Sequence, residues 1–366
     1  MVTDLRTIRW RPFRLPLRAR FETAMSALDS RDGVLVEVID AAGARGIGEA
    51  SPLPELGTGE AGDVLALLER AGAALLADGA ADALADGPGV SALRCALDVA
   101  VLDREARTRG LPLAALLAED HAQWVAANAV IGGGPPGEVA RHGLEALSAG
   151  YSVLKLKVGM GPVSDDVRRV EALRSACPEA TIRLDANGAW DEATAIAAIN
   201  TLYPFRIELL EQPVPIDAVE ALARVREHAS LRIAADESAQ NAVTREQVIE
   251  QRAADLLVLK PMPLGGLRPA LEIARLAADR GIGAFVTTTY DSSIGIAAAL
   301  HLAAALPFDA AHGLGTGEHL AADVVAKTLL PQAGRLALPS GPGLGVDYDE
   351  AALDAVATGP WREAHV

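Results

Sequence analysis

The feature that most constrains the fold of this chain is a regular alternation of short apolar segments and helix-length amphipathic segments, which begins near residue 124. The apolar segments have the length and composition of buried strands. Repeated strand–helix units close a parallel sheet when the helices cover its outside, so the pattern predicts an α/β fold of the (β/α)8 barrel type. The expected strands are Val125–Ile131, Ser152–Val158, Thr181–Asp185, Ile207–Glu211, Arg232–Asp236, Asp255–Lys260, Ala284–Thr289 and about His312–Thr316.

An open, doubly wound sheet is the structural alternative to a barrel. Such a sheet normally carries a GxGxxG phosphate turn after its first strand. The segment in that place, Val130-Ile-Gly-Gly-Gly-Pro-Pro136, does not match this pattern, which favours the barrel.

The two ends of the chain have a different texture from the middle. Arg6–Leu17 and Gly33–Ile39 alternate like strands, and they are followed by two helical segments. Near the other end, Arg335–Val346 is strand-like, is punctuated by Gly and Pro, and is expected to fold back onto the N-terminal domain. We therefore expect an α+β capping domain (1–120), a barrel (121–320) and a C-terminal segment (321–366) that returns to the capping domain.

Four successive predicted strands end on a charged residue. Asp185, Glu211, Asp236 and Lys260 are each separated by roughly 25 residues, about one strand–helix unit, so all four should reach the C-terminal rim of the barrel, where active sites form. Three neighbouring carboxylates repel one another unless a cation lies among them, and all-oxygen ligation suits Mg²⁺. Each acid could instead cap the following helix. Because three acids recur at the same strand position, metal binding is favoured over helix capping.

Two lysines end the second predicted strand. Lys155 and Lys157 are two residues apart and therefore share one face of the strand. Two neighbouring cations beside a metal lower each other's pKa, which would prepare one of these lysines to act as a general base. Lys260 comes from the sixth strand, across the barrel. The pattern predicts that a bound metal stabilises an enolate while a lysine removes the α-proton.

These motifs resemble the enolase superfamily, in its muconate-lactonizing-enzyme-like subgroup, over nearly the whole chain. The resemblance implies a modified (β/α)7β-type barrel with a capping domain. It implies that Asp185, Glu211 and Asp236 bind Mg²⁺, with Mn²⁺ as a substitute, and that Asn187 and Glu237 support them. Lys157 would be the acid/base, Lys155 its electrostatic partner and Lys260 the opposite lysine. The matching motifs are Lys155-Leu-Lys157, Asp185-Ala-Asn187, Glu211-Gln-Pro213, Asp236-Glu-Ser238, Leu259-Lys-Pro261 with Gly265-Gly266, and Gly48-Glu-Ala-Ser-Pro-Leu-Pro54.

Within that subgroup, Thr287–Gly295 and His312–Gly317 look most like o-succinylbenzoate synthases. That resemblance implies syn-dehydration of a cyclohexadiene carboxylate through an Mg-stabilised enediolate, in menaquinone or phylloquinone synthesis. Asp291, Ser292, Ser293 and the first N–H groups of the next helix are expected to bind a substrate carboxylate. Asp291 stands where relatives frequently carry glutamate. N-acylamino-acid racemase, dipeptide epimerase and muconate cycloisomerase reactions stay open on the same scaffold.

Two segments of the capping domain resemble the loops that cover the substrate in this family. Arg20 and Thr23 lie in the first, and Pro52–Gly57 form the second. His312 and His319, near the last predicted strand, are interpreted as structural. Two other classes remain as alternatives: a Schiff-base aldolase that uses Lys157 or Lys260, and a non-catalytic binding protein on a retired barrel.

The charge of the chain limits its partners. A formal net charge of −16 disfavours nucleic acid and anionic membrane surfaces as partners, but it does not disfavour a small carboxylate bound at a locally cationic site. No signal peptide or membrane-spanning run is recognisable. Cys95 and Cys177 suggest a reduced, cytoplasmic protein. A homo-oligomer stays open.

Overall fold

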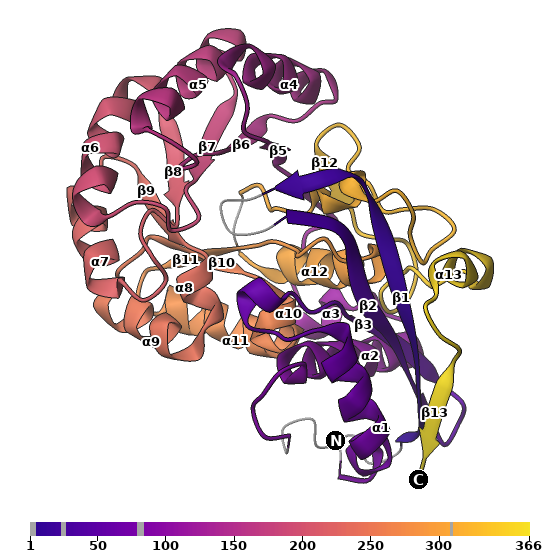
Figure 1. Cartoon of the computed structure of the whole chain (residues 1–366). Helices are drawn as coiled ribbons and strands as arrows, with labels where there is room; N and C mark the ends of the chain where they lie inside the picture. The colour runs from indigo at the N-terminus through magenta and orange to yellow at the C-terminus, as the bar shows by residue number, and fades with distance from the viewer. Residues whose placement is uncertain (1–4, 23–26, 79–83, 308–309) are drawn as a thin grey trace.

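The computed structural model describes residues 5–22, 27–78, 84–307 and 310–366, and it has two parts (Figure 1). One is an antiparallel sheet of order β13-β1-β2-β3, which we call the cap sheet. Its strands are β1 (Leu5–Glu22), β2 (Ala27–Asp40), β3 (Arg45–Ala50) and β13 (Arg362–His365). Helices α1 (Ala61–Asp78) and α2 (Val90–Arg109) pack on it, with α2 against β3. The strands predicted at Arg6–Leu17 and Gly33–Ile39 lie within β1 and β2.

The second part is a parallel seven-stranded sheet of order β11-β10-β9-β8-β7-β6-β5, which curls with its helices on the outside (Figure 1). Its strands are β5 (Ala129–Ile131), β6 (Val153–Lys157), β7 (Thr181–Asp185), β8 (Ile207–Glu211), β9 (Arg232–Ala235), β10 (Leu256–Leu259) and β11 (Gly283–Val286). The helices that follow them are α4 (Pro136–Ser148), α5 (Val163–Ala176), α6 (Glu192–Leu202), α7 (Val219–His228), α9 (Ala242–Gln251), α11 (Leu267–Ala278) and α12 (Ser293–Ala305). The barrel-type fold and its cap are therefore confirmed.

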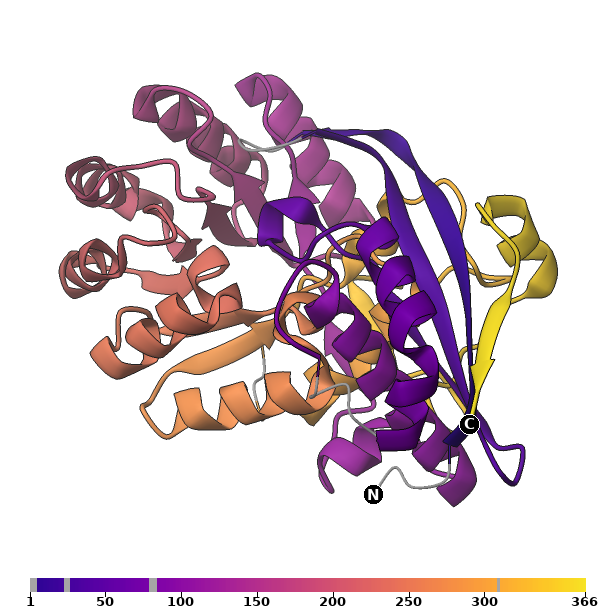
Figure 2. The same ribbon diagram turned by 60° about the horizontal axis from the view of Figure 1, so that its bottom comes forward.

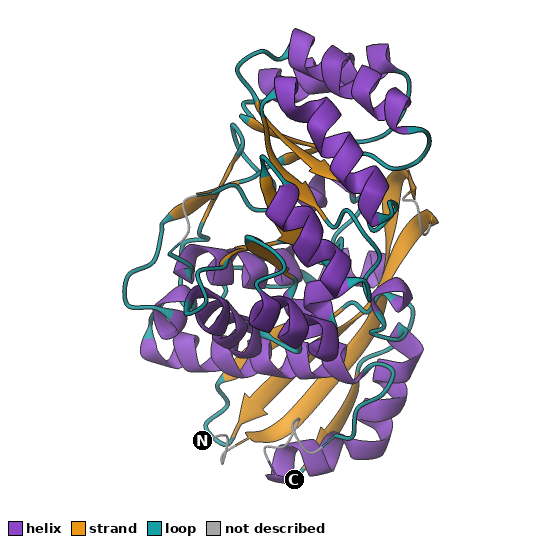
Figure 3. Ribbon diagram, turned by 90° about the vertical axis from the view of Figure 1, so that its left-hand side faces the viewer, coloured by secondary structure: helices purple, strands orange, loops and turns teal. Residues whose placement is uncertain are grey.

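Short elements complete the chain and turn it at the strand ends. They are η1 (Pro54–Leu56), α3 (Ala114–Leu117), η3 (Tyr203–Phe205), α8 (Glu237–Gln240), α10 (Pro261–Leu264), η4 (Gly315–His319) and α13 (Glu350–Val356). Two further strands, β4 (Trp124–Ala126) and β12 (Arg335–Ala337), pair with each other. Figure 3 shows the helices gathered around the curled sheet and the long strands of the cap sheet to one side.

The eighth predicted strand is not a strand. The segment around His312 forms isolated parallel bridges, from His312 to Ala127 and from Gly313 to Thr287. The His312 N–H donates to Ala126 O at 2.8 Å, and the Gly313 N–H donates to Val286 O at 2.9 Å. Two residues thus link β11 to the start of β5 and close the ring. Glycines at 313, 315 and 317 explain the short pairing, because glycine is a weak strand former.

An arginine lies inside the barrel together with apolar side chains. Arg183 on β7 is buried, donates to Glu208 Oε2 at 2.6 Å and to Ala311 O at 2.7 Å, and lies over the Phe285 ring. The apolar residues of this inner cluster are Leu209, Ala234, Leu256, Val258 and Phe285. The Arg183 guanidinium is satisfied by these partners, as a buried charge must be. The rim above it is left to the charged residues at the strand ends.

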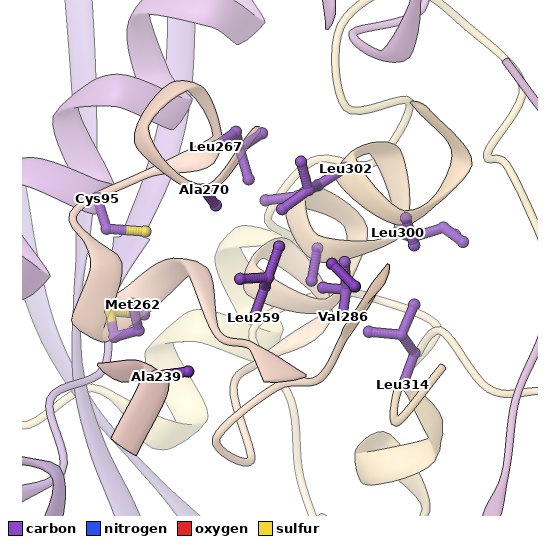
Figure 4. Packing of buried hydrophobic residues seen from close by; sticks show 14 of the residues in the cluster. Cys95, Ala239, Leu259, Met262, Leu267, Ala270, Val286, Leu300, Leu302 and Leu314 are labelled. Carbon is purple, nitrogen blue, oxygen red and sulfur yellow. The ribbon is translucent and has the colours of Figure 1, made fainter. Parts of the chain in front are cut away.

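The cap and the barrel share one continuous core, and the chain end returns to the cap (Figure 2). Figure 4 shows buried side chains from β10, β11, α11 and α12 in one group, with Cys95 of α2 and Met262 of α10 at its border. β13 pairs antiparallel with β1. Within Arg335–Val346, Arg335–Ala337 pairs with β4 beside the barrel, whereas the Leu344 N–H donates to Asp103 of α2 in the cap. No helix of the described residues is long and apolar enough to span a membrane.

Candidate active site

The register of the parallel sheet aligns the charged strand ends. Lys157 is paired with Asp185, and Asp185 with Glu211, so three neighbouring strands present their last residues in one row. Glu211 is paired with Ala234 of β9, and Asp236 stands two residues farther along. Side chains two residues apart on a strand point to the same face, so Asp236 points the same way as Ala234 and lies just beyond the row. Lys260 follows the last residue of β10.

In the structure the lysines pair directly with the acids. Lys155 Nζ lies 2.6 Å from Glu211 Oε1 and 3.0 Å from Asp185 Oδ2. Lys157 Nζ lies 2.6 Å from Asp185 Oδ2, and Lys260 Nζ lies 2.5 and 2.6 Å from the two oxygens of Asp236. All three acids are buried. The structure therefore brings together the six predicted residues, and the acids hold the ammonium groups at the barrel mouth.

Asn187 and Glu237 connect these pairs. Asn187 has a positive φ of 44°, and its N–H donates to Asp185 Oδ1 at 3.0 Å. Its side-chain oxygen accepts from Lys157 Nζ at 2.9 Å, and its amide nitrogen donates to Glu237 Oε1 at 2.9 Å. The amide can be oriented only one way between an ammonium donor and a carboxylate acceptor. Asn187 thus fixes the position of the Lys157 ammonium group.

The electrostatics of the site come from burial and close charges. Burial alone would lower the pKa of Lys155, but Asp185 and Glu211 outweigh it and raise that pKa. The expected lowering of the lysine pKa values applies to the site with a bound metal, and it stays a prediction. Burial raises the pKa of Glu211, and the nearby Asp185 carboxylate adds to this. Burial would also raise the pKa of Asp185, but Lys155 and Lys157 lower it.

The donors that are present decide whether the site fits a metal ion. Among the residues that the structure describes, no group of three or more His, Cys, Asp or Glu side chains is gathered so as to hold a metal ion. However, Glu211 Oε2 and Glu237 Oε2 are buried and accept no hydrogen bond from the described residues. Buried carboxylate oxygens without a donor fit a hard cation such as Mg²⁺. The ligand roles of Asp185, Glu211 and Asp236 stay a prediction that this donor set supports.

The charged row faces a cavity of about 150 Å³ between the barrel and the cap. The cap contributes Leu28, Leu53, Glu55 and Leu56, of which the last three lie in the predicted covering loop Pro52–Gly57. A second cavity of about 1040 Å³ adjoins it and shares Glu55, Leu56, Asn187 and Glu237. On the barrel side the smaller cavity is lined by Asn128, Val130, Lys155, Lys157, Asp185, Asn187, Asp236, Glu237, Lys260, Thr287, Thr288, Thr289, Tyr290, Gly313 and Thr316.

The predicted carboxylate pocket at Ser292 and Ser293 is not formed. Both serines are buried and do not line the smaller cavity. The Ser292 N–H donates to Glu49 Oε1 at 2.9 Å, and the Ser293 N–H donates to Asp323 Oδ1 at 3.1 Å. The first N–H groups of α12 are therefore already occupied by the protein's own acids. Sequence reasoning missed this because Glu49 lies far away in the chain.

The other predicted substrate contacts have mixed outcomes. Asp291 is buried, accepts from Thr289 Oγ1 at 2.7 Å, and does not line the smaller cavity, so it does not form the predicted contact. Arg20 lies on β1, and Thr23 lies outside the described residues. His312 accepts from the Val286 N–H and is buried, which fits its structural interpretation. His319 stacks edge-on against Tyr290.

Sequence reasoning missed two features of the site: the scarcity of lysine outside the cavity and the buried Asn128. The sequence carried a signal for the first. The chain contains four lysines, and three of them stand in the cavity while Lys327 is exposed. Arginine stays charged, whereas lysine can lose its proton when its pKa is lowered, so the placement of the few lysines is a signal for this site. Asn128 is 2% exposed and lines both the smaller cavity and a neighbouring one. Neither of its side-chain amide atoms has a hydrogen-bond partner among the described residues.

The chain is similar to proteins of known activity. The family model described as "Enolase C-terminal domain-like" matches residues 138–352. The chain is 42% identical to the o-succinylbenzoate synthase of Thermobifida fusca over 240 residues, 64% of this chain and 72% of that protein. It is 32% identical to muconate cycloisomerase 1 of Rhodococcus opacus over 273 residues, 72% and 71% of the two chains. The crystal structure of a dipeptide epimerase from Enterococcus faecalis, complexed with Mg and the dipeptide L-Leu-L-Tyr, superposes with a TM-score of 0.88 at 28% identity and covers 94% of this chain and 100% of that one.

Proposed function

Because the chain belongs to the enolase superfamily, whose members use Mg²⁺, we propose that it removes the α-proton of a small carboxylate and dehydrates a cyclohexadiene carboxylate, as an o-succinylbenzoate synthase does. The observation that carries the proposal is the cavity lined by Lys157 from β6 and Lys260 after β10. Asp185 and Asp236 line it between the two lysines, and Glu211 is buried against Lys155. Two ammonium groups on separate walls can act on one bound molecule from different sides. The 42% identity to the Thermobifida enzyme supports dehydration over the other reactions.

In this proposal each lysine has its own task. Lys157, held by Asp185 and Asn187, removes the proton α to the substrate carboxylate when it is in its neutral amine form and so becomes an ammonium group, while the electron pair of the C–H bond moves toward that carboxylate. Lys260 provides positive charge beside it, and Lys155 does so from one step deeper on β6. The C–O bond to the ring hydroxyl then breaks, and Lys157 returns its proton to the departing hydroxide, which leaves as water from the same face. Mg²⁺ held by Asp185, Glu211 and Asp236 would supply further positive charge at the carboxylate.

The sizes of the two cavities support a substrate with a tail. Ligand pockets commonly measure ~300–1,000 Å³, so a cavity of about 150 Å³ encloses the reacting ring and carboxylate but little more. The larger cavity adjoins it past Glu55, Leu56, Asn187 and Glu237. In the proposed complex the succinyl tail extends toward this larger cavity.

Racemisation or epimerisation is the second candidate, since a dipeptide epimerase is 31% identical over 363 residues, 94% of this chain. Both reactions begin with the same proton transfer, and they differ in the second step. Loss of a β-hydroxyl completes a dehydration, whereas reprotonation from the opposite side completes a racemisation. In a racemisation, Lys260 would deliver that proton.

The test offers the purified protein, with Mg²⁺, the cyclohexadiene carboxylate, an N-acyl amino acid, a dipeptide and a muconate in parallel. We expect kcat/KM to be at least about tenfold higher for dehydration than for the other three. Equal or higher kcat/KM for any of the others would contradict the proposed reaction.

The role of Lys157 is tested with a charge-conserving pair of variants. Lys157→Arg keeps the ion pair with Asp185 but cannot act as a base, so kcat should fall by about 10²–10⁴-fold. Lys327→Arg changes the exposed lysine and should leave kcat unchanged. Activity of Lys157→Arg within a few fold of the unmodified protein would show that another group is the base.

A further inference from the structure

A buried carboxylate of the cap lies at the junction between the two walls of the cavity. Glu49, near the end of β3, is 2% exposed. It accepts four hydrogen bonds, from Ser51 Oγ, from Ser292 Oγ, from the Ser292 N–H at 2.9 Å and from the Gly295 N–H at 3.0 Å. One of these donors belongs to the cap and three belong to the start of α12. The carboxylate therefore joins two segments that are far apart in the sequence.

Each of these segments continues directly into the cavity wall. Ser51 opens the turn that carries Leu53, Glu55 and Leu56, and these three line the smaller cavity. On the other side, Ser292 follows the wall segment 287–290, which also lines it. Glu49 is thus placed where a change in position would move both walls.

A third wall is tied to the same point. The Ser51 N–H donates to Met262 Sδ at 3.3 Å, and Met262 stands two residues after Lys260. Glu49, Met262 and Asp291 also line one small cavity. Figure 4 shows Met262 at the border of the packed core, in the same region as Cys95 of the cap helix α2.

The surroundings hold Glu49 and its turn firmly. Arg31 is buried on β2 and donates to Ser51 O at 2.7 Å and to Pro52 O at 3.0 Å, which fixes the backbone of the turn. Asp291 is buried on the barrel side, and its side chain accepts from Thr289 Oγ1. Arg31, Glu49 and Asp291 are all buried at this boundary between the cap and the barrel.

We propose that Glu49 is a positioning residue that fixes the cap turn 51–56 against the barrel wall 287–290 and so sets the shape of the catalytic cavity. It touches no substrate in this scheme. Glu49 influences the shape of the cavity only through the two backbone segments that it connects. The kinetic part of the proposal rests on the proposed function, whereas the structural part does not.

The chain offers a matched control for simple helix capping. Asp323 also caps the start of α12, because it accepts from the Ser293 N–H at 3.1 Å and from Ser293 Oγ at 2.6 Å. Asp323 belongs to the C-terminal part of the chain, and within the described part of the structure its carboxylate makes no hydrogen bond to the cap turn. Loss of either acid should weaken the start of α12, but only loss of Glu49 should release the cap turn.

The experiment compares Glu49→Gln with Asp323→Asn in the full chain. Hydrogen exchange followed by mass spectrometry, without substrate, should show at least about tenfold faster exchange in residues 51–58 for Glu49→Gln and unchanged exchange there for Asp323→Asn. In steady-state kinetics, Glu49→Gln should raise KM by about tenfold while kcat changes less than about threefold, and Asp323→Asn should leave KM unchanged. Equal exchange in residues 51–58 in both variants, or KM changes that parallel the loss of Tm in both, would overturn the proposal.

A second variant covers a failure of Glu49→Gln to fold. Ser51→Ala removes one donor from the cap side and leaves all three donors on α12 in place. It should speed exchange in residues 51–58 by a smaller factor, and unchanged exchange there would overturn the proposal. Hydrogen exchange needs no substrate. Altered exchange in a protein without dehydratase activity would therefore contradict the proposed function while leaving the positioning role intact.

Discussion

At the scale of single residues, the wall of the cavity is held together by buried acids paired with lysines. Asp185, Glu211 and Asp236 are buried, and each lies within hydrogen-bonding distance of a lysine ammonium group. Removing one member of such a set leaves an uncompensated charge, which costs ~3–5 kcal/mol. Glu211 has only one lysine partner and one oxygen without a donor among the described residues, so it gains most from an added cation.

Mg²⁺ should therefore stabilise the folded chain. A cation that binds only the native state adds about 2.7 kcal/mol when its concentration is 100 times its Kd. We expect Mg²⁺ to raise Tm and EDTA to remove the increase. Glu211→Gln should abolish the increase, whereas Glu250→Gln, a change at an exposed acid on α9, should retain it. The same Mg²⁺-dependent rise in both variants would show that Glu211 is not a ligand.

Asn128 should contribute to substrate binding and little to folding. A buried amide with no partner among the described residues loses its hydrogen bonds to water on folding, at a cost of ~1–3 kcal/mol. Asn128→Ala should therefore leave the free energy of unfolding unchanged or raise it by about 1 kcal/mol, and it should lower kcat/KM by about tenfold or more. Urea denaturation and steady-state kinetics measure the two effects. A large loss of stability with unchanged kcat/KM would contradict this assignment.

The predictable residues and the missed residues differ in a physical way. The lysines and acids could be predicted because each lies at or near the end of a strand, and strand ends of a parallel sheet meet at one rim. Glu49 and Asn128 could not be predicted in the same way. Asn128 stands between β4 and β5, and the partners of Glu49 in α12 are more than 200 residues away, so no local pattern connects them. The same long-range contact explains why the serine pocket was wrong.

At the scale of elements, strand β3 and helix α2 approach each other through glycine. A Cβ atom added at Gly48 would lie 2.0 Å from Ala96 O, and one added at Gly46 would lie 2.1 Å from Ala100 O. Both obstacles are backbone atoms of α2, which cannot turn aside as a side chain can. Gly46 and Gly48 are two residues apart, so both face α2 and leave no side chain between β3 and the helix. This close packing sets the position of Glu49 near the end of β3.

Alanine at Gly48 should therefore destabilise the protein. The clash with Ala96 O forces β3 and α2 apart, and we expect a loss of ~1–3 kcal/mol in the free energy of unfolding. Gly62 in α1 has no atom within 4 Å of the added Cβ, so Gly62→Ala should stabilise the helix by about 0.5–1 kcal/mol. Urea denaturation of both variants measures the contrast. Equal effects would contradict the close packing of β3 on α2.

At the scale of the whole molecule, polar contacts join the cap to the barrel at several points. Asp98 on α2 accepts from the Leu267 N–H at 2.7 Å and from Arg268, which fixes the start of α11. The repeat pattern could predict the barrel, but it could not predict these contacts, because they depend on how the parts dock. The division into 1–120, 121–320 and 321–366 stays a prediction, since β12 pairs beside the barrel and β13 pairs with the cap.

His301 joins three distant parts of the molecule as a neutral ring. It lies in α12, its Nδ1 accepts from the Ala114 N–H at 3.1 Å, and its Nε2 lies 3.1 Å from Leu344 O, to which it donates. Burial is the largest cause that lowers its pKa to about 4, from 6.5 in the unfolded chain. Between pH 6.5 and 4 the unfolded state therefore takes up a proton that the folded state refuses, and stability falls with falling pH.

Glu49 acts in the opposite direction, so the total slope of stability against pH does not isolate His301. Burial and the neighbouring Asp291 raise the pKa of Glu49 to about 7, and its folded form therefore gains stability as pH falls from 7 toward 4.5. His301→Gln keeps an acceptor for Ala114 and a donor for Leu344 without a titrating group. As pH falls from 7 to 4.5, the unmodified protein should lose on the order of 1–3 kcal/mol of unfolding free energy relative to His301→Gln. A difference that is constant over this range, measured by urea denaturation, would show that His301 is not held neutral between α12, α3 and the C-terminal segment.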